Sequence, residues 1–389
     1  MARMGEIELS NVTKRFGDVA AIDDVSLKIP AGTYCCLLGP SGCGKTTILR
    51  MIAGHETPTE GDIRIDGKSV VGLPPVRRGT AMMFQSYALF PHLTCVDNVA
   101  FNLKMRGIPK DARRQRARDM LARVHMEKFG DRMPAELSGG QQQRIALARS
   151  LITDPHVLLL DEPLSALDEF LRLQMRGNLR QMQKELGMTF IHVTHTQMEA
   201  IAVADVVVVM DHGYIAQAAP AHEVYTRPRS IYVARFMGGQ NVFSGRVTSA
   251  SGRVATLAGN GGARFLVPVE GTPPAEGEPF FFAVRRDHLT VEKGTAPGPG
   301  ETNTVHGTVI MTEYQGTWVK VTVAREGAEE FVANVSDARF FADPIAEGDR
   351  VVARWPTEAG HPLVTEGDED VSRLYGEDFS TTPAYLEGS

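Results

Sequence analysis

The chain has 389 residues, with 41 Lys and Arg against 47 Asp and Glu, and its formal net charge is −6. A chain of this length is expected to form two or more domains, and its slightly acidic balance without a long basic run argues against nucleic acid as a partner. Residues 1–10 lack the apolar core of a signal peptide. No stretch approaches the roughly 20 apolar residues of a spanning helix. If the protein works at a membrane, we therefore expect other chains to cross it.

The first informative element joins an apolar strand to a glycine-rich loop. Residues 34–38 (YCCLL) predict a strand, residues 39–47 read GPSGCGKTT, and a helical stretch follows and ends near Gly54. Between a strand and a helix, the pattern Gly-x-x-x-x-Gly-Lys-Thr binds phosphate through backbone N–H groups and the helix N-terminus. We expect Lys45 to contact the β- and γ-phosphates and the Thr46 hydroxyl to ligate Mg²⁺. The alternative is a glycine-rich turn with a chance lysine.

A strongly charged stretch follows at residues 111–128. Four apolar residues recur in it at helical spacing: Ala117, Met120, Leu121 and Val124. This spacing predicts an amphipathic helix whose basic face is solvated, although a basic face can also indicate nucleic-acid binding. We expect this helix to belong to a helical subdomain at about residues 86–155.

The next helix begins with unusual residues. Ser138 is a suitable N-cap, and apolar residues follow it at helical spacing. Gly139 and Gly140, directly after the cap, each weaken a helix start by roughly 1 kcal/mol relative to alanine. That loss is understandable if a ligand contacts the bare backbone, so this N-terminus is a second candidate phosphate site.

Two acids follow a second apolar run. Residues 157–160 (VLLL) suit a strand buried on both faces, and Asp161 and Glu162 come directly after it. Because a buried carboxylate without a partner is unfavourable, acids at this position indicate a nearby cation or water. We expect Asp161 to hold Mg²⁺ through water and Glu162 to polarise the attacking water. The alternative is that both acids only cap the helix after Pro163.

After about residue 238 the pattern changes to short alternating strands separated by glycine, proline and charged residues. Such strands predict a small barrel. A short motif occurs twice, once as Asn241-x-x-x-Gly245-x-Val247 and again as Asn303-x-x-x-Gly307-x-Val309. Two half-barrels joined near residues 297–300 would explain the repeat, and coincidence is the alternative. Residues 366–389 are predicted to form a flexible tail.

The segment Leu137-Ser138-Gly139-Gly140-Gln141 resembles the signature motif of ATP-binding cassette (ABC) ATPases, and here it occurs together with the phosphate-binding loop and an LLLDEP strand. The resemblance covers residues 6–237 and implies an α/β fold of the P-loop NTPase (RecA-like) class with a helical subdomain. Residues 238–365 resemble the β-rich TOBE accessory domain, an OB-like fold found in importer ATPases for sugars, polyamines, ferric iron or anions.

The resemblance implies roles for individual residues. Phe16 would stack on adenine, Gln85 would contact Mg²⁺ and the attacking water, and His195 would contact the γ-phosphate. With Glu162, the catalytic set is then Glu162, His195 and Gln85, and the Mg²⁺ set is Thr46, Gln85 and Asp161. The remaining nucleotide contacts would come from Gly39, Pro40, Ser41, Gly42, Cys43, Gly44, Lys45, Thr46 and Thr47, and, across a dimer interface, from Ser138, Gly139, Gly140, Gln141 and Asp168. His192, inside the preceding strand, is expected to be structural.

The resemblance also implies partners. Two protomers would pair head to tail and sandwich two ATP molecules, at the cytoplasmic face of the inner membrane, below two integral-membrane permease subunits fed by an extracytoplasmic solute-binding protein. A polyamine-like solute is favoured. The alternatives are a soluble ABC ATPase of DNA repair or translation, and half of an exporter.

The segment that starts at Gln85 would contact the permeases. Tyr87, Leu89 and Phe90 are more apolar than a solvated loop requires, and an exposed apolar patch of this kind normally marks a partner site. The alternative is that these side chains pack onto the helical subdomain.

Overall fold

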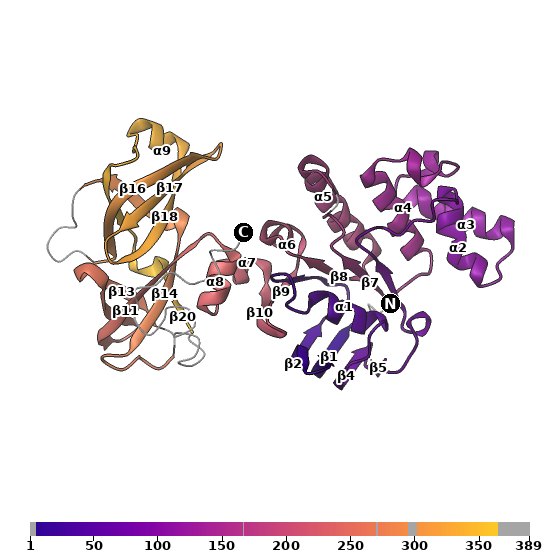
Figure 1. The fold of residues 1–389 in the computed structure, drawn as a ribbon, viewed down its shortest axis with the longest axis horizontal. Helices are drawn as coiled ribbons and strands as arrows, with labels where there is room; N and C mark the ends of the chain where they lie inside the picture. The colour runs from indigo at the N-terminus through magenta and orange to yellow at the C-terminus, as the bar shows by residue number, and fades with distance from the viewer. Residues whose placement is uncertain (1–4, 166, 270, 295–301, 365–389) are drawn as a thin grey trace. The chain divides into compact units, whose positions relative to one another are not determined.

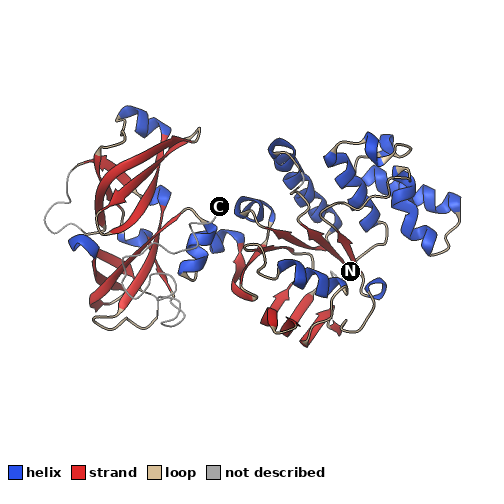
Figure 2. Cartoon of the chain, viewed as in Figure 1, coloured by secondary structure: helices blue, strands red, loops and turns tan. Residues whose placement is uncertain are grey.

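The computed structural model describes residues 5–165, 167–269, 271–294 and 302–364 (Figure 1). The chain divides into two compact units, residues 1–222 and 223–389. Most helices belong to the first unit, and the second consists mainly of strands (Figure 2). The domain boundaries expected from the sequence, 6–237 and 238–365, stay a prediction. The expected linker at residues 297–300 and the tail at 366–389 lie outside the described residues.

A six-stranded sheet forms the centre of the first unit, in the order β10-β9-β3-β8-β7-β6. All neighbouring pairs are parallel except β10 with β9. The strands are β3 (Tyr34–Leu38), β6 (Thr80–Met83), β7 (Val157–Asp161), β8 (Thr189–Thr194), β9 (Val206–Asp211) and β10 (Tyr214–Pro220). Every residue of β3, β7 and β8 is buried, which explains their continuous apolar runs. The two strands predicted from the sequence are confirmed.

A smaller antiparallel sheet has the order β2-β1-β4-β5. Its strands are β1 (Ile7–Phe16), β2 (Val19–Ile29), β4 (Glu60–Ile65) and β5 (Lys68–Ser69). One hydrophobic core joins both sheets to helix α1 (Lys45–Ala53). The helix ends at Gly54, which adopts the left-handed conformation of a C-cap.

A helical subdomain follows in the chain. Its helices α2 (Cys95–Met105), α3 (Lys110–Arg123) and α4 (Gly139–Leu151) surround a separate hydrophobic core. In α3, Ala117 and Leu121 are buried, which confirms the predicted amphipathic helix. The other helices of the chain's first 237 residues are α5 (Glu169–Leu186), α6 (Gln197–Val203), α7 (Ala221–Thr226) and α8 (Ile231–Met237).

The second unit contains two five-stranded antiparallel sheets, β13-β12-β11-β14-β20 and β15-β19-β16-β17-β18. The first five strands are β11 (Gln240–Ser251), β12 (Val254–Gly259), β13 (Arg264–Pro268), β14 (Pro279–Arg285) and β15 (Thr290–Lys293). The others are β16 (Thr304–Tyr314), β17 (Trp318–Arg325), β18 (Ala328–Ser336), β19 (Arg350–Arg354) and β20 (Gly360–Leu363), with α9 (Asp337–Ala342) after β18. Each half of the unit therefore gives its fifth strand, β15 or β20, to the sheet of the other half.

The repeated sequence motif has the same geometry in both halves. Val247 donates its N–H to Glu278 O (3.0 Å) and accepts from Gly277 N–H (2.8 Å). In the second half, Val309 N–H bonds to Asp349 O (2.9 Å) and Val309 O accepts from Gly348 N–H (2.8 Å). The repeat is therefore structural and not a coincidence.

The repeated asparagines connect the two halves. The Asn241 amide bonds to both backbone groups of Val332 on β18, at 2.8 and 2.9 Å. Asn303 accepts from Leu266 N–H on β13 at 2.8 Å. Each asparagine thus satisfies backbone groups of the other half, and one hydrophobic core runs through both halves.

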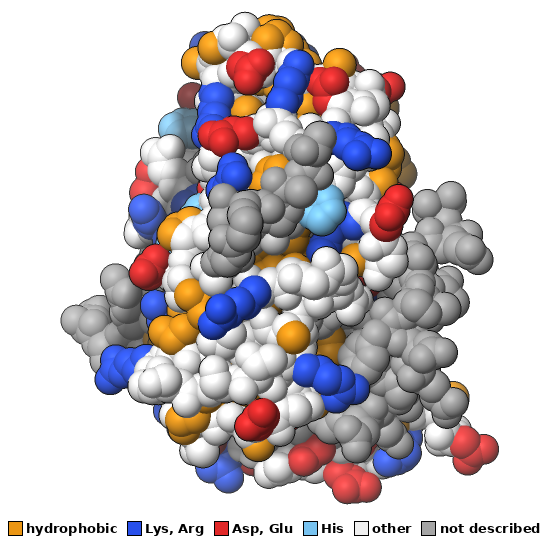
Figure 3. Space-filling model, turned by 90° about the vertical axis from the view of Figure 1, so that its left-hand side faces the viewer, with side chains coloured by type: hydrophobic (Ala, Val, Ile, Leu, Met, Phe, Trp, Pro, Cys, Tyr) orange, Lys and Arg blue, Asp and Glu red, His pale blue; other side chains and the backbone are white. Residues whose placement is uncertain are grey.

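Charged side chains of both signs are interspersed on the face drawn in Figure 3. All four cysteines are free and buried. Among the described residues, no helix has the length and apolar character needed to cross a membrane.

Candidate active site

The predicted site residues gather at the carboxyl ends of three neighbouring parallel strands. The phosphate-binding loop follows β3, Glu162 follows β7 and His195 follows β8. Since the carboxyl ends of parallel strands meet at one edge of a sheet, this edge is where an α/β protein binds its ligand.

Glycines shape the phosphate-binding loop. Gly44 has φ 99°, and a Cβ atom there would lie 2.3 Å from Ile22 Cδ1 and 2.6 Å from Ala21 O. Gly42 has φ 82° but open space around it. A side chain would therefore disturb the loop at Gly44 by steric overlap and at both positions by backbone strain.

Lys45 is buried, with 6% of its surface exposed. Its Nζ donates to Gly39 O (2.7 Å) and Pro40 O (2.6 Å) and contacts Cys43 Sγ (3.5 Å). In the part of the chain that the structure describes, no carboxylate lies within ion-pair distance of this ammonium group. A buried cation bound only by neutral acceptors fits a site for an anionic ligand.

Asp161 supplies a buried carboxylate beside the loop. Its Oδ1 accepts from Thr46 Oγ1 at 3.0 Å, and 9% of the residue is exposed. Burial raises the pKa of Asp161, although the hydrogen bond from Thr46 acts in the opposite direction. A carboxylate and a hydroxyl in this arrangement are the oxygen ligands that a hard divalent cation prefers.

Glu162 has an unusual backbone conformation. Its φ is 44°, and the left-handed region costs a residue with a Cβ atom roughly 1–2 kcal/mol. Three hydrogen bonds hold it there: Glu162 N–H donates to Val193 O (3.1 Å), and Glu162 O accepts from Ser165 N–H (3.2 Å) and from Ser165 Oγ (2.9 Å). Strain of this kind is concentrated at functional sites.

Two further predicted residues contact the Glu162 carboxylate. Gln85 Nε2 donates to Oε2 at 3.2 Å, and His195 Nδ1 lies 3.6 Å from Oε1. The structure thus brings the predicted catalytic set together. The Ser165 hydroxyl accepts a hydrogen bond from Gln85 Nε2 at 3.2 Å. The sequence did not indicate this contact, because a serine in a turn carries no local signal of it.

A buried hydrogen-bond chain lies beside His195. His192 contacts Tyr34 OH through Nδ1 (2.9 Å) and Glu199 Oε1 through Nε2 (2.8 Å), and Thr194 Oγ1 donates to Glu199 Oε2 (3.1 Å). Burial raises the pKa of Tyr34, so the phenol keeps its proton. Burial alone would raise the pKa of Glu199, but hydrogen bonds from His192 and Thr194 bring it below its ordinary value. The expected structural role of His192 is confirmed.

The signature segment forms a second cluster. Ser138 is the N-cap of α4, and its N–H donates to Gln141 Oε1 at 3.0 Å. Gly139 is exposed, whereas Gly140 is buried, and a Cβ on Gly140 would lie 3.0 Å from the Leu171 side chain. Packing against Leu171 therefore also favours a small residue at 140, a reason that the sequence alone does not show.

Asp168 belongs to this second cluster. It is the N-cap of α5, and its Oδ1 accepts from Leu171 N–H at 2.9 Å. Among the described residues, no hydrogen bond or ion pair joins residues 138–141 to the phosphate-binding loop. The predicted nucleotide contacts therefore form two groups within one chain.

Phe16 lies at the end of β1 and is half exposed. Lys14 Nζ lies 4.7 Å from the centre of its ring. The structure thus leaves an aromatic surface accessible next to a cation, as a base-stacking residue requires.

The prediction of an exposed apolar patch after Gln85 was wrong. Tyr87 is buried, Leu89 packs against the core of the helical subdomain, and the Phe90 ring lies 4.4 Å from the Phe101 ring. The alternative interpretation holds, because the apolar side chains of this segment have a hydrophobic core to pack against.

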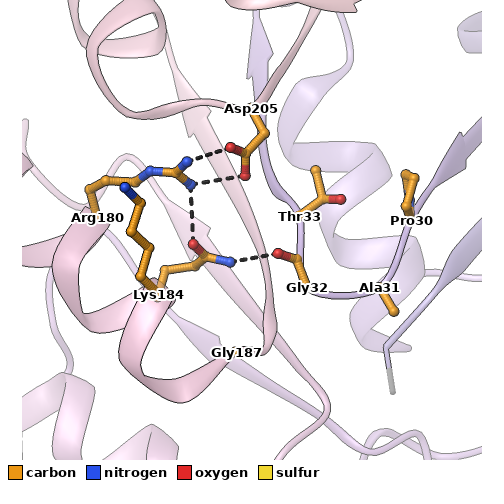
Figure 4. A pocket seen from close by; sticks show the side chains of 9 residues that line it. Pro30, Ala31, Gly32, Thr33, Arg180, Lys184, Gly187 and Asp205 are labelled. Carbon is orange, nitrogen blue, oxygen red and sulfur yellow. Dashed lines mark hydrogen bonds and ion pairs between the residues drawn. The ribbon is translucent and has the colours of Figure 1, made fainter. Parts of the chain in front are cut away.

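A cavity of about 510 Å³ lies away from this site. Its lining includes Gly32 and Thr33, which precede β3, whereas the phosphate-binding loop follows that strand. Arg180 pairs with Asp205, and Gln183 Nε2 donates to Gly32 O at 2.8 Å (Figure 4). This cavity lies at the opposite edge of the sheet from the phosphate-binding loop, so it is not the nucleotide site.

The parallel sheet, the glycine-rich loop and the converging acid, amide and imidazole define a P-loop nucleoside triphosphatase. A family profile described as "ABC transporter" matches residues 22–165, and one described as "TOBE domain" matches residues 282–363. The chain is 44% identical over 362 residues to the spermidine/putrescine import ATP-binding protein PotA of Rubrobacter xylanophilus, covering 93% of this chain and 94% of the relative. It is 43% identical over 332 residues to the Fe(3+) ions import ATP-binding protein FbpC of Brucella abortus, covering 85% and 91%.

A solved structure is also similar. The ATP-binding cassette MJ0796, in a dimeric post-hydrolysis state bound to ADP and Pi, matches with a TM-score of 0.50 and 32% identity over 55% of this chain and 98% of that chain. The chain belongs to the family of ABC transporter ATP-binding proteins, and it is an ATPase. The fold class and the family expected from the sequence are confirmed, and the relatives fit the importer prediction and not the alternative of DNA repair or translation.

Proposed function

We propose that this chain is the ATP-hydrolysing subunit of an importer for a small solute. The observation that carries the proposal is the convergence of Gln85, Glu162 and His195 beside the Thr46–Asp161 pair. This arrangement places a potential base, a polar orienting group and an imidazole next to a phosphate-binding loop, as ATP hydrolysis requires.

Each residue has a distinct part in the reaction. Lys45 would release its bonds to the loop carbonyls and bind the β- and γ-phosphates, and Phe16 would stack on the adenine. Thr46, Asp161 and Gln85 would hold Mg²⁺, which neutralises charge on the phosphate oxygens when bound. Glu162 would accept a proton from the water whose oxygen attacks the γ-phosphorus, while the bond to the ADP oxygen breaks and His195 contacts the γ-phosphate.

Two copies of the chain would complete each site. The exposed Ser138 and Gly139 have no bond to their own phosphate-binding loop, so they are available to the nucleotide of a second protomer. The dimeric state of the similar cassette bound to ADP and Pi supports this arrangement. In a head-to-tail pair, Ser138, Gly139, Gly140, Gln141 and Asp168 of one protomer would close over ATP held by the other.

Import would require further proteins. We infer a peripheral position on the cytoplasmic face of the inner membrane, with two permease subunits and an extracytoplasmic solute-binding protein. The relatives are named for spermidine and putrescine or for Fe(3+), and polyamine is the solute favoured here. Uptake of labelled spermidine and of Fe(3+), compared in cells with and without this chain, would decide between the two.

Isothermal titration with Mg-ATP tests the phosphate site. Lys45→Ala is expected to abolish tight binding, because no other cation of the described loop can replace its ammonium group. Unchanged affinity would contradict the assignment.

Hybrid dimers test the shared sites. A mixture of Lys45→Ala and Ser138→Arg protomers contains hybrids in which one site has both lesions and the other has none. The mixture is expected to hydrolyse ATP although neither variant alone does. If tagged hybrids form without recovered activity, the signature acts within its own chain.

Crosslinking tests the membrane partner. Ser86 is exposed, so Ser86→Cys is expected to preserve the ATPase activity and to crosslink to an integral-membrane protein in native membranes, with a yield that changes on addition of ATP. An active, well-folded variant that never crosslinks there would contradict the proposal.

A further inference from the structure

We propose that Arg149, on the helix that begins with the signature segment, is a positioning residue that sets the conformation of the segment carrying Gln85. Arg149 lies in the last turn of α4, whose N-terminus is at Gly139. The inference rests on the proposed function, because it assigns Arg149 an effect on hydrolysis through Gln85.

The segment after Gln85 is strained. Tyr87 has φ 59° and Ala88 has φ 47°, so two consecutive residues with Cβ atoms adopt the left-handed conformation. Each costs roughly 1–2 kcal/mol relative to an ordinary backbone conformation. Such a pair persists only where the surroundings hold it in place.

Arg149 supplies the restraint. Its Nη2 donates to Tyr87 O and its Nη1 donates to Ala88 O, both at 2.7 Å. Its guanidinium also lies 5.4 Å from the centre of the Phe90 ring. One planar fork therefore binds the carbonyls of both strained residues, a geometry that lysine cannot reproduce.

The environment strengthens these bonds. Burial lowers the pKa of Arg149, as expected for a cation that is partly withdrawn from water. Hydrogen bonds from a charged donor are short and stronger than neutral ones, and a low local dielectric increases their strength.

The same segment is bound on its other side by Glu162 and the proline that follows it. Gln85 Nε2 donates to Glu162 Oε2 at 3.2 Å, and Tyr87 OH donates to Pro163 O at 3.4 Å. The segment from Gln85 to Ala88 thus connects α4 to the end of β7. A displacement of α4, and with it the signature segment, would change the position of Gln85 relative to Glu162.

Steady-state ATPase kinetics of the full chain test this inference. Arg149→Lys is expected to lower kcat about tenfold or more with little change in the KM for ATP, because the phosphate-binding loop is untouched. Arg144→Lys, on the same helix, is the matched control and is expected to keep the wild-type kcat. Near-ultraviolet circular dichroism and Mg-ATP titration verify folding, and Arg149→Gln replaces Arg149→Lys if the latter folds poorly.

Two double variants distinguish a positioning role of Arg149 from a general effect on stability. In a Gln85→Ala background, Arg149→Lys is expected to cause no further loss of kcat, since the two changes act through the same contact. Ala88→Gly is expected to restore most of the activity lost in Arg149→Lys, because glycine adopts a positive φ without strain.

The outcomes are decisive for the inference. The inference is overturned if Arg149→Lys keeps the wild-type kcat or if Ala88→Gly restores no activity to it. It is also overturned if Arg149→Lys lowers kcat by the same factor in the Gln85→Ala background as in the wild-type chain. If Gln85→Ala alone keeps the wild-type kcat, the proposed role of Gln85 fails instead.

Discussion

The two units of the chain use buried polar residues in different ways. At the active site, Lys45 is bound only by neutral acceptors, Asp161 has a pKa raised by burial, and Glu162 has a strained backbone. In the C-terminal unit, Asn241 and Asn303 have hydrogen-bond partners, and their bonds join the two halves. A poorly compensated cation and a strained glutamate thus lie at the site of chemistry, whereas hydrogen-bonded asparagines join the two halves of the C-terminal unit.

The largest effect is expected from Glu162→Gln. The variant keeps the side-chain shape but cannot accept a proton, so kcat should fall by about 10²–10⁴-fold, the usual contribution of a general base. Affinity for Mg-ATP should remain, as measured by titration. Glu169→Gln, an exposed acid in the first turn of α5, is the control and should keep the wild-type rate. Turnover near wild type in Glu162→Gln would remove this residue from the reaction.

Gly307→Ala tests whether glycine in the C-terminal unit serves packing. A Cβ there would lie 2.2 Å from Ala324 O and 2.7 Å from Val323 Cγ1, so the free energy of unfolding should fall by about 1–3 kcal/mol. Gly177→Ala is the control, since a Cβ at this position in α5 meets open space. It should raise stability by roughly 0.5–1 kcal/mol. Urea unfolding measures both, and equal stabilities of Gly307→Ala and wild type would contradict the packing argument.

Asn241→Ala and Asn303→Ala test the equivalence of the two halves. Each leaves a backbone N–H without its partner, at Val332 or at Leu266, which costs about 1–3 kcal/mol where the group is buried. Both variants should lose stability in thermal or urea unfolding, and Asn303→Ala should lose more, because Asn303 has φ 53°, a conformation that alanine tolerates less well than asparagine. A loss in only one would show that the two halves are not energetically equivalent.

The smallest expected effect is the contribution of Glu199 to the pH dependence of the free energy of unfolding. Hydrogen bonds hold the pKa of this carboxyl below its ordinary value of 4.5 in the folded protein. At pH values just below 4.5, the unfolded chain therefore binds a proton at Glu199 more readily than the folded chain does. Glu199 stabilises the fold above this pH range, and its contribution is lost as the pH falls through the range. Glu199→Gln should lack this component in urea unfolding from neutral pH to about pH 3, whereas Glu185→Gln should retain it. An unchanged profile in Glu199→Gln would contradict the prediction.

Local patterns predicted much of the site. The strands at residues 34–38 and 157–160 follow from continuous apolar runs, and the phosphate-binding loop follows from the spacing of Gly39, Gly44 and Lys45. These features depend on neighbours in the chain, and backbone sterics and hydrophobic burial act similarly on them in any fold.

Such local patterns could not predict contacts between residues that are distant in the chain. Tyr87, Leu89 and Phe90 suggested an exposed surface, because the sequence does not show that a hydrophobic core lies beside them. Ser165 and Arg149 gave no signal of their own, since their roles depend on loops that are distant in the chain.

By itself, the sequence determined the presence of an ATP-binding cassette, the two acids at the end of the strand that became β7 and the repeat in the C-terminal unit. Only the tertiary structure decided that Glu162 is left-handed, that Arg149 holds the segment after Gln85, and that the halves of the C-terminal unit exchange their fifth strands. The physical reason is that motifs are set by local spacing, whereas strain and strand exchange are set by contacts between residues far apart in the chain.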